Sequence, residues 1–140
     1  MGKTSKKDTA SLTLLGGGRK DKAKPYAKLE TFPNKNPDRP YTIELYTDEF
    51  TCLCPATGQP DFAKILIRYV PRNKIVESKS LKLYLWSFRN KGCFHEHLTN
   101  VILDDLVKAM NPVWCMVEGT FNVRGGIGIK VVAEEGARSQ

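Results

Sequence analysis

Two cysteines and an aspartate in one short segment are the residues of this chain best suited to nucleophilic chemistry. Cys54 is followed by Pro55 and precedes Asp61 by seven positions, with the turn sequence Thr-Gly-Gln-Pro between them. A loop cysteine becomes a thiolate where a cation or oriented amides lie nearby. Because the turn can bring the Asp61 carboxyl group back towards Cys54, the segment predicts a nucleophile beside an acid. The alternative is a buried structural thiol and a turn carboxylate.

The same region also allows a metal site. Cys52 and Cys54 are one residue apart, and Cys93, His95 and His97 form a second group of potential ligands. Zinc sites usually contain cysteines two residues apart and a second pair downstream. The spacing here differs, and alternate residues at the start of a helix do not share a face. We therefore expect no metal and keep the metal site as an alternative.

Residues 77–84, ESKSLKLY, place charged and hydroxyl groups where a predicted strand gives way to a helix. Glu77 ends the strand, and Ser78 is expected to be the N-cap. Lys79 and Lys82 are three residues apart and share a helix face. Two lysines in the first turns oppose the helix dipole, as expected where an anion binds. A solvated basic face is the alternative.

His95 and Glu96 precede a second helical pattern. The helix dipole favours a carboxylate at this place, so Glu96 is interpreted either as a stabilising end charge or as a ligand contact. A buried carboxylate can accept two hydrogen bonds, from the ring N–H and the exocyclic amine of a guanine-like base.

Hydrophobic periodicity indicates the elements that must position these residues. Strands are predicted at 41–49, 62–70, 113–123 and 127–133, with a brief extended stretch at Ile75 and Val76. Helices are predicted at 78–89 and from about 98 to 110, and loops at 31–40 and 50–60. This order predicts an α+β domain in which two helices cover one face of a four-stranded antiparallel sheet. The other face keeps apolar side chains, which favours an oligomer.

Charge is concentrated near the N-terminus. The 140 residues carry a net charge of +7, and residues 1–30 hold eight Lys or Arg against three Asp or Glu. Residues 1–25 are predicted to be a disordered basic tail, followed by a single domain at 26–140. A basic RNA-binding module is one interpretation of this tail. Apolar runs are too short to span a membrane and no secretory signal is seen, so we expect a cytoplasmic protein.

Together these segments resemble one family, the short-form NADPH-dependent 7-cyano-7-deazaguanine reductases, which are the nitrile reductases of queuosine biosynthesis in tRNA. ESKSLKLY matches the family signature at every position, and FTCLCPATGQPDFA and SFRN…FHEH resemble its catalytic and substrate segments. The resemblance covers about residues 30–135. It implies the tunnelling fold, whose ββααββ order agrees with the predicted elements.

The resemblance also implies a role for each candidate residue. Cys54 would attack the nitrile carbon to give a covalent thioimide, and Asp61 would donate a proton to the nitrogen. Glu96 would hold the guanine-like edge. The other residues of the substrate pocket would be Val76, Glu77, Ser78 and His95. Lys79 and Lys82 are the candidates for contact with the NADPH phosphates.

Further expectations follow from the family as a whole. Two NADPH would reduce 7-cyano-7-deazaguanine to 7-aminomethyl-7-deazaguanine, without direct contact to nucleic acid or membrane. The subunits would form stacked pentamers, a decamer, with each site completed across a subunit boundary. Cys93 and His97 stand where acidic residues are expected in many relatives. A zinc-dependent cyclohydrolase of the same fold is the main rival.

Overall fold

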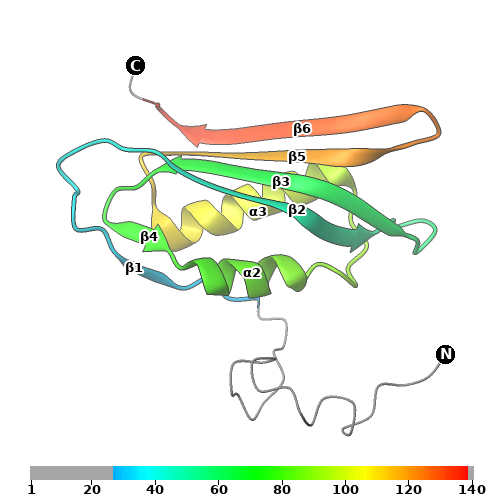
Figure 1. The fold of residues 1–140 in the computed structure, drawn as a ribbon, viewed down its shortest axis with the longest axis horizontal. Coiled ribbons are helices and arrows are strands. Elements are labelled where there is room, and N and C mark those ends of the chain that lie inside the picture. The colour runs from blue at the N-terminus through cyan, green and yellow to red at the C-terminus, as the bar shows by residue number, and fades with distance from the viewer. Residues whose placement is uncertain (1–26, 139–140) are drawn as a thin grey trace, which may run out of the picture.

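A four-stranded antiparallel sheet with two helices on one face forms the body of the protein, whose computed structural model describes residues 27–138 (Figure 1). The sheet has the order β2-β3-β5-β6, from the strands Ile43–Leu53, Pro60–Val70, Trp114–Arg124 and Ile127–Gly136. The helices are α2, Ser78–Trp86, and α3, His95–Met110. The α+β class and the ββααββ order are confirmed. The predicted tail at residues 1–25 lies outside the described residues.

A small second sheet adds to this order. β1, Thr31–Pro33, pairs antiparallel with β4, Lys74–Val76. The prediction of a loop throughout 31–40 is therefore wrong for its first three residues. The partner strand is about forty residues away in sequence, so the pairing is a tertiary contact that local composition cannot reveal.

β2 extends beyond its predicted end. The prediction stops too early because a bulge interrupts the alternation of the strand. The register with β3 shifts between Thr47 and Phe50, and after the shift Phe50 and Cys52 face the core. Two consecutive exposed residues at the bulge hide the strand pattern in the sequence. The predicted loop at 50–60 is therefore wrong at its N-terminal end. Cys52 lies inside the strand, paired with Asp61, and the turn is shortened to residues 54–59.

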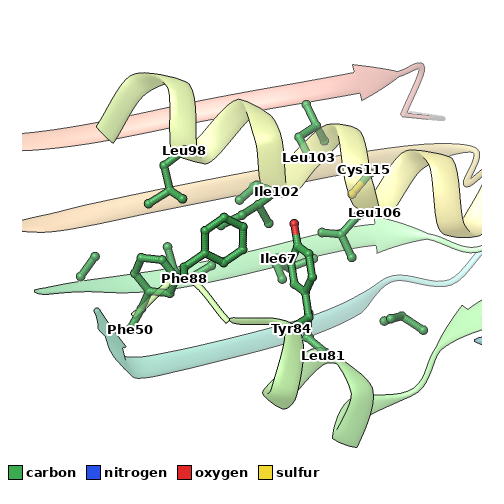
Figure 2. Close-up of a cluster of buried hydrophobic side chains, with 14 of the residues drawn as sticks. Phe50, Ile67, Leu81, Tyr84, Phe88, Leu98, Ile102, Leu103, Leu106 and Cys115 are labelled. Carbon is green, nitrogen blue, oxygen red and sulfur yellow. The ribbon is translucent and has the colours of Figure 1, made fainter. Parts of the chain in front are cut away.

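The core lies between the helices and the inner face of the sheet (Figure 2). β3 contributes its odd-numbered residues 63 to 69. On the α2 side, the rings of Tyr84 and Phe88 meet edge to face with centroids 5.2 Å apart. The Tyr84 hydroxyl group points towards α3 and donates a hydrogen bond to Asp105. These contacts hold α2 against α3.

The cap of α2 differs from the prediction. The N-cap is Glu77, whose carboxylate accepts hydrogen bonds from the backbone N–H groups of Lys79, at 2.8 Å, and Ser80, at 2.6 Å. The prediction of Ser78 as the cap is wrong because Glu77 can satisfy two amides at once with its two oxygens.

The uncovered face and the edges of the main sheet remain free within the described chain. Tyr46, Phe62 and Val132 are exposed, and alternation places them on the face opposite the helices. β2 and β6 each have a single hydrogen-bonded neighbour in this sheet. Neither described helix is long and apolar enough to cross a membrane.

Candidate active site

Asp61 is the centre of a charged cluster at the start of β3. Its side chain is only 4% exposed, and it faces the helices. One carboxylate oxygen, Oδ2, lies 3.2 Å from Nε2 of His95. The other, Oδ1, accepts a hydrogen bond from Nη1 of Arg124. A buried carboxylate is costly unless it is paired and hydrogen-bonded, and these partners meet that requirement.

His95 is fixed in place by contacts on α3 and β5. Its imidazole ring stacks on Phe121, with centroids 3.8 Å apart and an interplanar angle of 7°. The Thr99 hydroxyl group donates to the His95 carbonyl oxygen at 2.9 Å, which ties the residue to the first turns of α3. The predicted site residues Asp61 and His95 are therefore brought together, from segments 34 positions apart.

Cys54 opens the turn between β2 and β3. Its N–H donates to the carbonyl oxygen of Gln59 at 2.8 Å, and its own carbonyl accepts from the N–H of Gly58 at 2.9 Å. Gly58 has φ of +70°, a conformation that glycine adopts without strain. These two bonds fold the turn back on itself, so that Cys54 lies at the same end of the sheet as Asp61.

The turn also favours the thiolate form of Cys54. The hydroxyl group and the N–H of Thr57, together with the N–H of Ala56, lower the pKa of Cys54 below its ordinary value of 9.0. Burial and the negative charge of Asp61 act in the opposite direction but are smaller. Hydrogen bonds to sulfur favour its charged form, which is the nucleophile.

The other three cysteines have raised pKa values. Burial, followed by the charge of Asp61, raises the pKa of Cys52 to about 11. Burial also raises the pKa of Cys93, and that of Cys115 to about 12. Cys54 is thus the one cysteine of the four whose pKa is lowered, which supports it over Cys52 as the nucleophile.

A second group of predicted site residues lies at the opposite end of the sheet. The Val76 N–H donates to the Tyr69 hydroxyl group at 3.3 Å, which places β4 beside the end of β3. Tyr69 lies eight positions after Asp61 on the same extended strand, a span of roughly 26 Å. Val76, Glu77 and Ser78 therefore do not meet Cys54 within one chain. The Val76 side chain is buried in the core, and that of Ser78 is exposed.

The remaining predicted residues lie on the surface. Glu96, in the first turn of α3, is exposed, as are Lys79 and Lys82 on α2. A groove of about 580 Å³ separates α2 from β2. Ser78, Lys82, Trp86 and Arg89 are among the residues that line it. Lys79, one turn away on the same helix, does not line this groove.

The potential metal ligands do not gather into a site. Among residues 27–138, no group of three or more His, Cys, Asp or Glu side chains is arranged to hold a metal ion. Cys52 is buried inside β2, whereas His97 is exposed in the first turn of α3.

Several residues of the site were not found from the sequence. Arg124 and Gln59 join the charged cluster, since Nη2 of Arg124 donates to Oε1 of Gln59 at 3.0 Å. Thr57 contributes the main hydrogen bond to the thiol. Thr57 and Gln59 belong to a recognised turn, but Arg124 is 63 positions from Asp61 and only the fold places it there.

Comparison with known proteins identifies the family. A family model described as QueF-like protein matches residues 60–140. A curated NADPH-dependent 7-cyano-7-deazaguanine reductase from Syntrophus aciditrophicus is 60% identical over 131 residues, which is 94% of this chain and 91% of the relative. The chain belongs to the QueF-like family.

Other QueF-like relatives agree with this assignment. A protein of the same name from Thermomicrobium roseum is 59% identical over 109 residues, 78% of this chain and 85% of its own length. Among solved structures, the apo form of an archaeosine synthase QueF-Like has a TM-score of 0.66 and 26% identity. It aligns over 72% of this chain and 99% of that one. The QueF-like fold is thus supported by both sequence and structure.

Proposed function

We propose that this protein is an NADPH-dependent nitrile reductase that converts 7-cyano-7-deazaguanine into 7-aminomethyl-7-deazaguanine for queuosine biosynthesis. The observation that carries the proposal is the thiol of Cys54, whose pKa the turn lowers, at the same end of the sheet as the paired Asp61 and His95. Curated QueF-like relatives with about 60% identity carry the name of this reductase.

The thiolate of Cys54 begins the reaction by adding to the nitrile carbon. A carbon–sulfur bond forms and one π bond of the C≡N group breaks, leaving a covalent thioimide. The nitrogen takes up a proton from Asp61, which carries the proton released when the Cys54 thiol ionises. A nitrile is a poor hydride acceptor and a thioimide a better one, so covalent catalysis lowers the barrier to the reductive step.

Lys82 and Arg89 give the groove two positive charges that suit the phosphates of a reductant. When bound, NADPH supplies hydride to the carbon that Cys54 has activated. Glu77 already occupies the first amides of α2, so these are not available to phosphate oxygens. The side chains of Lys79 and Lys82 would make the phosphate contacts instead, with Lys82 at the groove and Lys79 outside it.

Substrate recognition is assigned to residues at both ends of the sheet. Glu96 would accept the two donors of the guanine-like edge, with His95 beside it, while Val76, Glu77 and Ser78 would complete the pocket. Val76 would contribute its backbone, because its side chain is buried. Since the two ends lie far apart in one chain, a second copy must supply the missing half.

A homo-oligomer of stacked five-membered rings, a decamer, satisfies this requirement. Within residues 27–138 the edges of β2 and β6 are unpaired, so they could pair with neighbouring copies, and exposed Tyr46 and Val132 would be covered. No direct contact with nucleic acid is part of the proposal. All four cysteines are free thiols, which fits a reducing cytoplasmic location.

Product analysis tests the activity. Purified protein mixed with 7-cyano-7-deazaguanine should oxidise two NADPH for each amine formed, and metal chelation should leave the rate unchanged. Formation of no amine, or activity that depends on stoichiometric zinc, would exclude the proposed reductase and favour the cyclohydrolase-type rival.

A further inference from the structure

Arg124 connects Asp61 with the turn that carries Cys54, two parts of the site that the proposed reaction needs in fixed positions. Its Nη1 donates to Oδ1 of Asp61, and its Nη2 donates to Oε1 of Gln59 at 3.0 Å. The backbone carbonyl of Gln59 in turn accepts the N–H of Cys54 at 2.8 Å. One guanidinium group therefore bridges the acid and the turn that carries the nucleophile.

A bulge in β5 brings Arg124 to the correct face of the sheet. Phe121 pairs with Ile129 and Arg124 pairs with Ile127, so β5 has one more residue than β6 between these pairs. Phe121 faces the core beneath His95. Strict alternation would place a residue three positions later on the opposite face, and the extra residue reverses this. The bulge thus re-aims Arg124 towards Asp61.

The bridge also makes the two oxygens of Asp61 unequal. A guanidinium group has only donors, so Oδ1 is held as an acceptor. A proton carried by Asp61 must then lie on Oδ2, which faces Nε2 of His95 at 3.2 Å. The charged or titratable groups near Asp61 are Arg124 on β5, His95 on α3, Cys52 on β2 and Cys54 in the turn. Among residues 27–138, His95 alone is recorded at the free oxygen.

We propose that Arg124 is a positioning residue of the reductase: it holds Oδ1 of Asp61 and the Cys54 turn together, so that proton transfer runs through Oδ2 and His95. This inference rests on the proposed function. Arg124 contacts neither substrate nor NADPH in this role. Its removal should therefore slow the chemical step and leave the affinity for both ligands unchanged.

Three variants test this role. Arg124→Gln removes the charge and the double donor, whereas Arg124→Lys keeps a cation that can reach one partner. Arg68→Gln is the matched control, because Arg68 pairs with Glu44 on the surface and its side chain is 40% exposed, against 44% for Arg124. Melting temperatures establish that each variant is folded.

The measurements are the rate of thioimide formation without NADPH, followed by mass spectrometry, and steady-state kinetics with NADPH. In Arg124→Gln both the adduct rate and kcat should fall about 10- to 100-fold, as expected for a misplaced catalytic group. KM for each ligand should stay within about twofold. Arg124→Lys should recover part of the loss, and Arg68→Gln should match the wild type.

Other outcomes would overturn the inference. A raised KM for NADPH with normal adduct formation would make Arg124 a cofactor contact. An equal loss of rate in Arg68→Gln would show that the effect of Arg124→Gln is general destabilisation. A wild-type rate in Arg124→Gln would show that Arg124 has no role in the mechanism. Wild-type protein that forms no adduct would instead refute the proposed function itself, so the two failures are distinguishable.

Discussion

The hydroxyl group of Thr57 is the main reason that Cys54 differs from the other cysteines. Thr57→Val keeps the shape of the side chain and removes its hydrogen bond to sulfur. The pKa of Cys54 should therefore rise towards 9.0, and the thiolate fraction at neutral pH should fall. Alkylation by iodoacetamide measured against pH should show a midpoint below pH 9 in the wild type and a higher midpoint in Thr57→Val.

The exposed Thr42 offers a matched control for this experiment. Thr42→Val should leave the midpoint unchanged, and Cys52, whose pKa is about 11, should stay unmodified at neutral pH. A midpoint that does not move in Thr57→Val would show that the backbone amides alone hold the thiolate.

At the scale of elements, the N-terminus of α2 combines a structural role with a proposed ligand contact. Glu77 caps the helix through two amides, so Glu77→Ala should lower the free energy of unfolding by about 1 kcal/mol. Glu77→Ser supplies another good cap and should largely restore stability. Chemical denaturation of the three proteins measures this effect.

The same pair of variants separates the two roles of Glu77. If its carboxylate also contacts the substrate, Glu77→Ser should remain stable but show a KM for the nitrile raised about tenfold, the value of one hydrogen bond to a charged group. A normal KM in this stable variant would restrict Glu77 to capping.

The elements also show how far sequence reasoning reaches. The alternation of β3 and the helical spacing of α3 are regular, and both were predicted because one face of each is buried. β2 was truncated because the bulge before Phe50 breaks its alternation. The sequence did not predict Arg124 as a site residue, because its position depends on another bulge and on a contact with Asp61, 63 positions away. Irregular backbone is thus the reason that neither the end of β2 nor Arg124 was predicted from the sequence.

At the scale of the whole molecule, the separation of Cys54 from Ser78 predicts shared active sites. Cys54→Ala and Ser78→Trp should each be inactive alone, the second because a bulky group enters the pocket at an exposed position. When the two chains are co-expressed and assemble at random, about a quarter of the sites should receive both intact halves. Differently tagged subunits allow the mixed oligomers to be purified and assayed.

Two controls complete this test of assembly. Co-expression of Cys54→Ala with itself under both tags should stay inactive, and sedimentation should give the same particle size for all mixtures. Mixed oligomers that are no more active than their parents would contradict a site shared between subunits.

The central claim is that Cys54 forms a covalent bond with the nitrile substrate. Mass spectrometry of intact protein mixed with 7-cyano-7-deazaguanine, without NADPH, measures this bond directly. The account predicts one adduct per chain, located on Cys54 by peptide mapping, present in Cys52→Ala, absent in Cys54→Ala and discharged when NADPH is added. An adduct on Cys52, or active protein that forms no adduct on Cys54, would contradict it.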